Sequence, residues 1–531
     1  MTDRSRSMSA RRTTYLAGVC ALLVGLTACT GEAEPGRAGT EPTPAGSSSP
    51  SEPAVSETVA RTVVLGDQEV SFEVGPVRVQ DGVGLLSVQA TEVDPGDGKN
   101  GANVDLALSD PYSDNRIGPS GARLVDTAAG TVSTVAIDGA DHAVMTTGSS
   151  QLSDEPVTMV AGFAAPTGET VDVLLPYVGY FVGVPVLTEA DDGAAAVALA
   201  DLTDSATADL TLPVATLDRY TEDQAGAVRT RTEAEEVTVA IAADVLFAAD
   251  SSDLGPQADA ALASAGAQIA AYSAGALTVV GHTDDVASDE YNQDLSVRRA
   301  QSVADRLATL VDLAPYPPAV EGRGESEPAA AGSSPEARAS NRRVELLFTP
   351  SADATHAGEE PAPVGELPAA EGPVGTGAAG VEVAFLKDAK FAVSLDEVQR
   401  VGDTLVGQVR VERLAGGRAN LAHFFSAGAW GSRGKLDIQV QWAATKLTLL
   451  QGGTRYFPLD YARDDLGQRD PLADRYLSTP FGDGEVQTVT VVWPSVPGDT
   501  VALDAPVFRS ATDAESGGPA FRLTDIPVVE P

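Results

Sequence analysis

The sequence predicts a multidomain chain, with a central α/β (βαβαβ) sandwich flanked by two mainly β regions that we expect to be β-sandwiches. The 531 residues exceed what one hydrophobic core normally serves, because domains of about 150 residues are typical. In the centre, the apolar residues change from the alternation typical of strands to the three- and four-residue steps typical of helices. A low-complexity linker at 350–378 then separates this centre from the C-terminal region.

Residues 1–28 have the features of a secretory signal. Their basic region holds four arginines: Arg4, Arg6, Arg11 and Arg12. An apolar run from Leu16 to Leu26 follows, which is too short to span a bilayer comfortably. The sequence Leu26-Thr27-Ala28-Cys29 resembles the bacterial lipobox, which implies that residues 1–28 are removed and that Cys29 carries a lipid anchor. The alternative is an uncleaved apolar segment with an incidental cysteine, and the export route, Sec or Tat, stays open.

Residues 29–59 are rich in Pro, Gly, Ser, Thr and Glu, which predicts a disordered tether. As a random coil this tether would reach roughly 30 Å. Of the two cysteines, Cys20 lies in the segment expected to be removed and Cys29 is expected to be modified. We therefore expect no disulfide and no cysteine-based metal site, and we expect no cofactor.

The formal net charge of −41 limits the possible partners. Nucleic acid requires a basic face, so no nucleic-acid partner is expected. An anionic membrane surface would also repel this chain, so membrane attachment has to come from the lipid on Cys29. We expect a cell-envelope protein, anchored to the outer face of the cytoplasmic membrane or to an outer membrane.

Residues 60–225 and 379–531 are expected to form the two mainly β regions, whose protein partner the sequence does not reveal. Both contain short apolar runs separated by Gly, Pro, Asp and Asn clusters. The predicted strands are 62–65, 70–74, 171–175, 180–184, 381–385, 405–411 and 486–493. The two regions also look like weak repeats, with 124–130 aligned to 447–453 and 165–171 aligned to 495–501. Duplication and independent use of the same turn chemistry are both open.

Residues 234–349 form the predicted α/β unit. Alternation from Val237 to Ile241, followed by Val245-Leu246-Phe247, predicts a first strand. An Ala-rich helix at 257–272 and a second strand at 277–280 come next. A second helix is predicted at 297–311, with Ser296 as its N-cap, and a third strand at 343–348.

A series of polar and glycine motifs runs through this central unit. In order they are Gly281-His282-Thr283-Asp284, Tyr291-Asn292, Leu295-Ser296, Arg299-Ala300, Gly322-Arg323-Gly324-Glu325 and Asn341-Arg342-Arg343-Val344-Glu345. Over roughly residues 236–348 they make the chain similar to the OmpA-like C-terminal domain. The resemblance implies a peptidoglycan-binding module that recognises the diaminopimelate of the stem peptide. It places the key acid of the family at Asp284 and the key arginine at Arg299.

The chemistry of such a ligand fits these two residues. Diaminopimelate within a stem peptide presents an ammonium beside a carboxylate, so its receptor needs one fixed anion and one fixed cation. In a helix that begins at residue 297, Arg299 would lie in the first turn, where a cation opposes the helix dipole at a cost of roughly 0.3–1 kcal/mol. An incoming carboxylate would explain that placement, because free backbone N–H groups also point outward there. Arginine can hold a carboxylate through two parallel hydrogen bonds, which lysine cannot.

Asn292, Thr283 and Arg342 complete the predicted ligand-binding set. Asn292 is expected to shape the loop and to meet the ligand, while Arg342 could contact the ligand or pair with local acids. For Arg343 and His282 we expect structural roles. One departure from the family pattern is Ala287, where a glycine is usual three residues after the key acid. A glycine there often has a positive φ, which alanine resists, so the stem-peptide preference is open.

The sequence favours a non-enzymatic lipoprotein that links a membrane to the cell wall. A wall hydrolase targeted by the central domain is one alternative, but no Gly-x-Ser-x-Gly or His-Glu-x-x-His motif is present. Another alternative is an adhesion or partner-docking scaffold in which the β regions carry the main activity. Four aromatic residues could form such a docking surface, although core packing is their commoner use: Trp430, Trp442, Tyr456 and Phe457.

Overall fold

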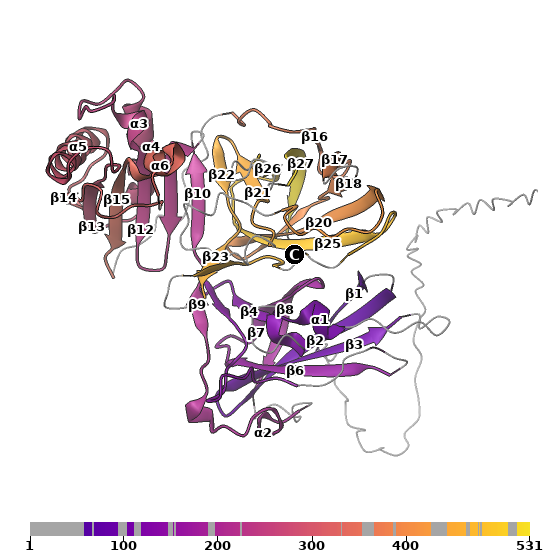
Figure 1. The fold of residues 1–531 in the computed structure, drawn as a ribbon. Helices are drawn as coiled ribbons and strands as arrows, with labels where there is room; N and C mark the ends of the chain where they lie inside the picture. The colour runs from indigo at the N-terminus through magenta and orange to yellow at the C-terminus, as the bar shows by residue number, and fades with distance from the viewer. Residues whose placement is uncertain are drawn as a thin grey trace, which may run out of the picture. The chain divides into compact units, whose positions relative to one another are not determined.

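A computed structural model describes residues 58–530 apart from 66–67, 94–103, 111–117, 147–151, 153–154, 189–196, 224–225, 331, 353–365, 386–388, 426–442, 464–467, 476, 478–479 and 508–517 (Figure 1). The predicted signal, Cys29 and nearly all of the predicted tether lie outside the described residues, as does much of the 350–378 linker. No helix within the described ranges is both long and apolar enough to cross a membrane.

The N-terminal region is mainly β, as predicted. Its strands are β1 (Val59–Leu65), β2 (Gln68–Gln80), β3 (Val83–Glu92), β4 (Arg123–Asp126), β5 (Thr131–Ser133), β6 (Val157–Ala164), β7 (Thr170–Leu175), β8 (Gly179–Leu187) and β9 (Val214–Thr216). They form one sheet in the order β6-β3-β2-β8-β7-β4-β5-β9, and β1 pairs with β2. Two short helices, α1 (Val104–Leu108) and α2 (Leu199–Leu202), interrupt the strands.

The C-terminal region is also mainly β. Its strands are β16 (Val374–Thr376), β17 (Val381–Phe385), β18 (Ala389–Ser394), β19 (Val398–Val401), β20 (Thr404–Ala415), β21 (Thr448–Gln451), β22 (Thr454–Tyr456), β23 (Asp460–Ala462), β24 (Arg469–Pro471), β25 (Val486–Pro494), β26 (Thr500–Ala505) and β27 (Phe521–Val529). An earlier strand, β10 (Arg219–Asp223), pairs with β22. That both regions are layered as β-sandwiches stays a prediction.

The two β regions share one strand order, which favours duplication, one of the two explanations that the sequence left open. The pairings β25-β20-β19-β27-β26-β21-β22-β10 repeat the order of the N-terminal sheet. Each of the two orders contains one parallel pair at the same place, β2 with β8 in the N-terminal sheet and β19 with β27 in the C-terminal region. The same register shift follows, between Val171 and Val173 in one region and between Val501 and Leu503 in the other. The alignment of 165–171 with 495–501 therefore agrees with the strands. The alignment of 124–130 with 447–453 is displaced by two residues at its start, because Leu124 faces Val173 as Leu449 faces Leu503.

The central domain contains more elements than predicted. After β11 (Val228–Thr232), the order is β12 (Val237–Ala242), α3 (Ala243–Leu246), α4 (Ala258–Ala270), β13 (Gly275–Gly281), α5 (Asp289–Leu310), β14 (Pro318–Gly322), α6 (Pro335–Asn341) and β15 (Arg343–Pro350). The strands lie in the order β14-β13-β15-β12-β11, with β13 and β14 parallel and the other pairs antiparallel. The prediction βαβαβ is wrong in lacking α3, β14 and α6, and 243–246 is helical where the sequence suggested a continued strand.

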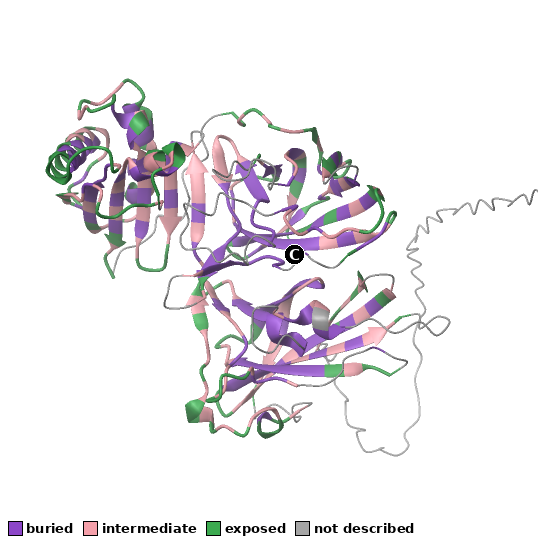
Figure 2. Cartoon of the chain, in the orientation of Figure 1, coloured by how far each residue is buried: buried purple, intermediate pink, exposed green. Residues whose placement is uncertain are grey.

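One hydrophobic core joins the two longer helices of this domain to its sheet. Alternate strand residues point inward, among them Val239, Val279 and Leu346. Leu262 of α4 and Leu307 of α5 pack against them, and all five side chains are completely or almost completely buried. Figure 2 shows buried residues on these strands and exposed residues on the outer side of α5.

The structure describes two of the four aromatic residues suggested for a docking surface, and both are buried. Tyr456 and Phe457 are 3% and 1% exposed, and Phe457 packs edge-on against Tyr220 with ring centroids 5.2 Å apart. Both side chains belong to the interior: they lie at and just after β22, which pairs with β10 on one edge and with β21 on the other, and Tyr456 is part of the hydrophobic core of this region. Trp430 and Trp442 lie outside the described residues.

Candidate ligand-binding site

Helix α5 begins at Asp289, eight residues before the predicted start at 297. Ser288 is the N-cap: its side chain accepts a hydrogen bond from the Tyr291 N–H at 3.3 Å. Asp289 and Glu290 fill the first turn, where acidic side chains favour the helix dipole. The Ser-Asp-Glu sequence was therefore the missed signal of the helix start. Arg299 lies about three turns into the helix, so the argument from the helix dipole does not apply to it.

Ser296, predicted as the N-cap, is instead completely buried inside the helix. Its Oγ donates to the Gln293 carbonyl at 2.8 Å and accepts from the Gly324 N–H at 3.0 Å. The helix can approach the sheet here because Gly281 and Gly322 have no side chain. A Cβ on Gly281 would stand 2.1 Å from the Ser296 carbonyl oxygen, and one on Gly322 would stand 2.5 Å from its Oγ. The two glycines thus let α5 bring Asn292 and Arg299 next to the ends of β13 and β14.

Arg299 is a buried cation with uncommitted donors. The residue is 4% exposed, its Nε donates to the Ser251 carbonyl at 2.9 Å, and its guanidinium lies 5.2 Å from the centre of the Phe247 ring. Within the described part of the chain its two terminal nitrogens have no hydrogen-bond partner. Burial lowers the pKa of Arg299, and the charges of Asp244, Asp250 and Asp284 act in the opposite direction. The two terminal nitrogens are not among the fully buried, unpaired atoms of the described residues, so a ligand can reach them, and a carboxylate is the acceptor that fits the guanidinium fork best.

Asp284 lies in the loop after β13, and its charge is close enough to act on Arg299. Its side chain is 17% exposed, and Oδ2 accepts from Nη1 of Arg342 at 2.9 Å. Arg342 uses its other two nitrogens on Asp244, with Nε to Oδ1 at 3.0 Å and Nη2 to Oδ2 at 2.7 Å. Oδ1 of Asp284 has no partner among the described residues, so one carboxylate oxygen stays open to a ligand donor.

Asn292 holds the loop that carries Asp284. This side chain is 2% exposed, and its Nδ2 donates to the Asp284 carbonyl at 3.0 Å and to Glu325 Oε2 at 2.6 Å. One of these bonds goes to the backbone of the loop itself, which fits the loop-shaping part of its predicted role. Thr283 is buried as well: its N–H donates to the Gly324 carbonyl at 2.9 Å, while its hydroxyl has no partner among the described residues.

Ala287 does not strain the loop. It is absent from the six non-glycine residues with positive φ in the described part of the chain, so the concern that alanine would resist such a conformation does not apply. The second acid, Asp285, points to a different partner: Arg338 of α6 donates from Nε to its Oδ1 at 2.6 Å. The loop is thus fixed from both sides, by Asn292 within and by Arg338 at the surface.

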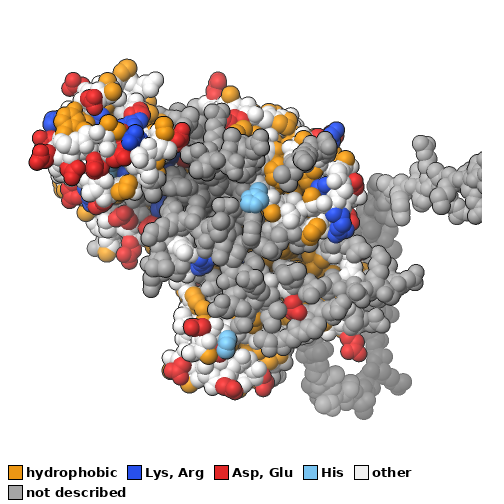
Figure 3. All heavy atoms as spheres, viewed as in Figure 1, with side chains coloured by type: hydrophobic (Ala, Val, Ile, Leu, Met, Phe, Trp, Pro, Cys, Tyr) orange, Lys and Arg blue, Asp and Glu red, His pale blue; other side chains and the backbone are white. Residues whose placement is uncertain are grey.

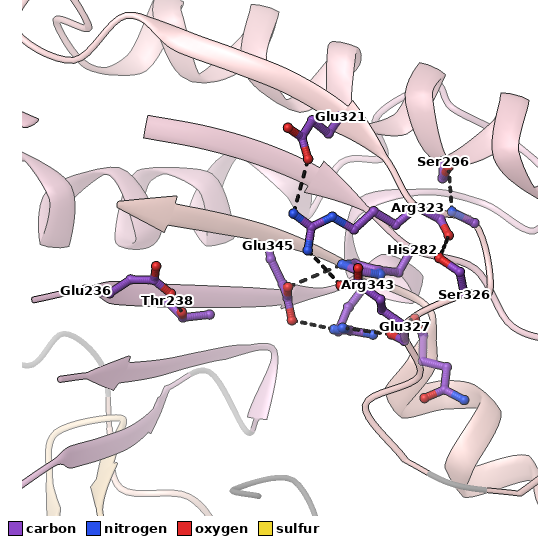
Figure 4. A network of polar contacts seen from close by, with 12 residues as sticks. Glu236, Thr238, His282, Ser296, Glu321, Arg323, Ser326, Glu327, Arg343 and Glu345 are labelled. Carbon is purple, nitrogen blue, oxygen red and sulfur yellow. Dashed lines mark hydrogen bonds and ion pairs between the residues drawn. The ribbon is translucent and has the colours of Figure 1, made fainter. Parts of the chain in front are cut away.

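His282 and Arg343 belong to a structural network beside the site (Figure 4). Nε2 of His282 lies 3.2 Å from Glu345 Oε2, and Nε of Arg343 donates to Glu345 Oε1 at 2.6 Å. Burial raises the pKa of Glu345, but the His282 hydrogen bond and the Arg343 charge outweigh it and bring the pKa to about 2. Glu345 is therefore ionised at neutral pH and pairs with both His282 and Arg343. Among the residues the structure describes, no cluster of His, Cys, Asp and Glu is arranged to hold a metal ion.

The domain around this site matches a known family. Residues 246–342 match the model of the OmpA family. Outer membrane porin F of Pseudomonas aeruginosa is 46% identical over 74 residues, which are 14% of this chain and 21% of the porin. Outer membrane protein A of Bordetella avium is 36% identical over 104 residues, 20% of this chain and 53% of that protein. The putative lipoprotein YfiB of Escherichia coli is 28% identical over 134 residues, 25% of this chain and 84% of that protein.

Solved structures match a similar share of this chain. The cell wall anchor of the T6SS from Pseudomonas aeruginosa is 34% identical, with 24% of this chain and 91% of that chain covered and a TM-score of 0.22. The peptidoglycan-associated lipoprotein from Burkholderia pseudomallei is 26% identical, with 20% and 88% covered and a TM-score of 0.17. The chain thus spans about a fifth of the porin and about half of the Bordetella protein. The matched family is not a catalytic one, and the named relatives are outer membrane proteins and lipoproteins.

Proposed function

We propose, from the premise that residues 246–342 are a domain of the OmpA family, that the chain binds peptidoglycan non-covalently through the diaminopimelate of the stem peptide. The observation that carries the proposal is a buried guanidinium, Arg299, whose terminal N–H groups have no acceptor among the described residues. Asp284, whose charge acts on Arg299, keeps one carboxylate oxygen open. A ligand with a carboxylate beside an ammonium satisfies both groups at once.

In this arrangement Arg299 receives the carboxylate of diaminopimelate and Asp284 receives its ammonium. Arg342 holds Asp284 in place, Asn292 anchors the loop from within, and Thr283 offers its hydroxyl at the strand end. The charges of the ligand and of the two principal residues cancel, so the complex buries no net charge, which would be costly. This role requires recognition and no reaction, in agreement with a non-enzymatic function.

Binding to purified wall sacculi tests this function. The full chain is expected to sediment with sacculi that contain diaminopimelate, and free diaminopimelate is expected to release it. Sacculi with lysine at the same stem position are the matched control, because the lysine side chain offers an ammonium and no carboxylate for Arg299. Equal sedimentation with both wall types, unaffected by free diaminopimelate, would refute the proposal.

We further propose that a lipid on Cys29 attaches the chain to a membrane, so that the protein links membrane and wall. The motif Leu26-Thr27-Ala28-Cys29 supports this, and the relative YfiB is described as a putative lipoprotein. In cells fed a labelled fatty acid, the wild-type chain is expected to take up the label and a Cys29→Ser variant to lack it. Label in the variant equal to that in the wild type would exclude Cys29 as the attachment point.

Partner docking by the β regions is the second candidate function. Their shared strand order shows one architecture used twice, and two regions of this kind offer a repeated scaffold for protein partners. The residues proposed to bind sacculi all lie in the central domain, so the two functions are separable by experiment.

A further inference from the structure

Three charged residues from three distant parts of the chain form a row that leads into the proposed site. Asp244 lies in α3, Arg342 directly follows α6, and Asp284 lies in the loop after β13. Arg342 is 98 residues from Asp244 and 58 residues from Asp284 in the sequence. The fold therefore has to bring these elements together before the row can form.

The hydrogen bonds of Arg342 are unequally divided. Two of its nitrogens, Nε and Nη2, bind the two oxygens of Asp244 at 3.0 and 2.7 Å, which is the bidentate geometry that arginine forms best with a carboxylate. One nitrogen, Nη1, is left for Asp284, and it binds Oδ2 at 2.9 Å. Asp244 thus fixes the plane and the direction of the guanidinium, and this restricts how much of Asp284 the guanidinium can cover.

Asp244 also sets the net charge of these three residues. Asp244, Arg342 and Asp284 together carry one net negative charge, and Arg299 nearby carries one positive charge. Without the charge of Asp244, the net charge of Arg342 and Asp284 would be zero. The guanidinium would then be free to turn toward Asp284 and donate to both of its oxygens, and the ammonium of a ligand would have to compete with it at each of them.

We propose that Asp244 is a positioning residue for ligand binding: by engaging Arg342 through two hydrogen bonds, it keeps one oxygen and the negative charge of Asp284 available for a ligand ammonium. The inference rests on the proposed function, since it concerns the same site. Asp244 itself is 61% exposed at its side chain and contributes little to the core, so its replacement is expected to leave the fold intact.

A double-mutant cycle tests whether Asp244 acts through Arg342. In calorimetric titrations of the full chain with diaminopimelate, Asp244→Asn is expected to weaken binding about tenfold, since it frees a charged donor to compete with the ligand. In the background of Arg342→Gln, the same Asp244→Asn change is expected to alter the affinity less than twofold, because the competing guanidinium is gone. A through-space effect of the Asp244 charge would instead weaken binding equally in both backgrounds, and that result would overturn the proposal.

Asp259→Asn is the matched control. It removes the same charge from a similarly exposed carboxylate, which also holds an arginine through two hydrogen bonds, but that arginine is Arg306 at the surface, so the affinity of this variant is expected to equal that of the wild type. Unchanged affinity of Asp244→Asn beside a wild type that binds would overturn this inference and leave the proposed function standing. A wild type that fails to bind diaminopimelate would remove the proposed function, and this inference with it.

Discussion

Replacement of Arg299 by alanine is expected to weaken the binding of diaminopimelate by about 10- to 150-fold, which corresponds to roughly 1.5–3 kcal/mol. The variant loses the terminal N–H groups that would donate to the ligand carboxylate and leaves that carboxylate without a positive partner. Asp284→Ala is expected to cause a loss of the same order, because it strands the ligand ammonium. Calorimetric titration of each full-length variant with diaminopimelate measures these losses.

Two further variants separate recognition from folding. Arg299→Ala also removes the bond to the Ser251 carbonyl and the contact with the Phe247 ring, so its thermal stability has to be measured alongside. Arg299→Lys keeps the charge and loses the two-pronged geometry, and it is expected to recover only part of the affinity. Arg306→Ala, on the same helix but at the surface and paired with Asp259, is expected to bind like the wild type. A folded Arg299→Ala protein with wild-type affinity would contradict the assignment of Arg299.

Replacement of Gly281 by alanine is expected to lower the free energy of unfolding by about 1–3 kcal/mol or more, the range found for overpacked positions. The new Cβ would stand 2.1 Å from the Ser296 carbonyl oxygen and 2.8 Å from its carbon, and both belong to the backbone of α5. A backbone cannot rotate away as a side chain can, so the helix has to move. Since α5 carries Asn292 and Arg299, diaminopimelate binding is expected to fall with stability. Urea unfolding of the full chain, monitored by a probe in the central domain, measures the first effect.

Gly255→Ala is the matched control for this variant. Gly255 lies in the same domain, and its Cβ would meet only the Leu246 carbonyl oxygen at 3.6 Å, an ordinary contact distance. Little change in stability is expected. If Gly281→Ala unfolded at the same urea concentration as Gly255→Ala and bound diaminopimelate equally well, close packing of α5 on β13 would not be what positions the site.

The strongly patterned elements of the central domain were predictable, and the weakly patterned ones were not. Helix α4 and strands β13 and β15 were placed within a few residues because their apolar periods are regular. Strand β14 was missed: it begins with Pro318, and only five residues pair with the inner strand β13. Helix α6 was missed because of its seven-residue length, although Ser334 and Pro335 carry the usual signs of a helix start.

For the site, the sequence predicted which residues take part better than it predicted the elements that carry them. The resemblance to the OmpA-like domain singled out Asp284, Arg299, Asn292, Thr283 and Arg342, and the structure gathers these residues around the ends of β13 and β14. The start of α5 was predicted too late because polar residues, Asn292 and Ser296, occupy buried helix positions that an apolar pattern cannot detect. Asp244 could not be predicted at all. It stands in a short helix far from the motifs in the sequence, and only the tertiary fold brings it to Arg342.

A crystal structure of the full chain with bound diaminopimelate examines the central claim most directly. We expect one carboxylate of the ligand at about 3 Å from the terminal nitrogens of Arg299, and the adjacent ammonium at about 3 Å from Oδ1 of Asp284. Diaminopimelate bound elsewhere, or bound here with neither residue in contact, would contradict the claim.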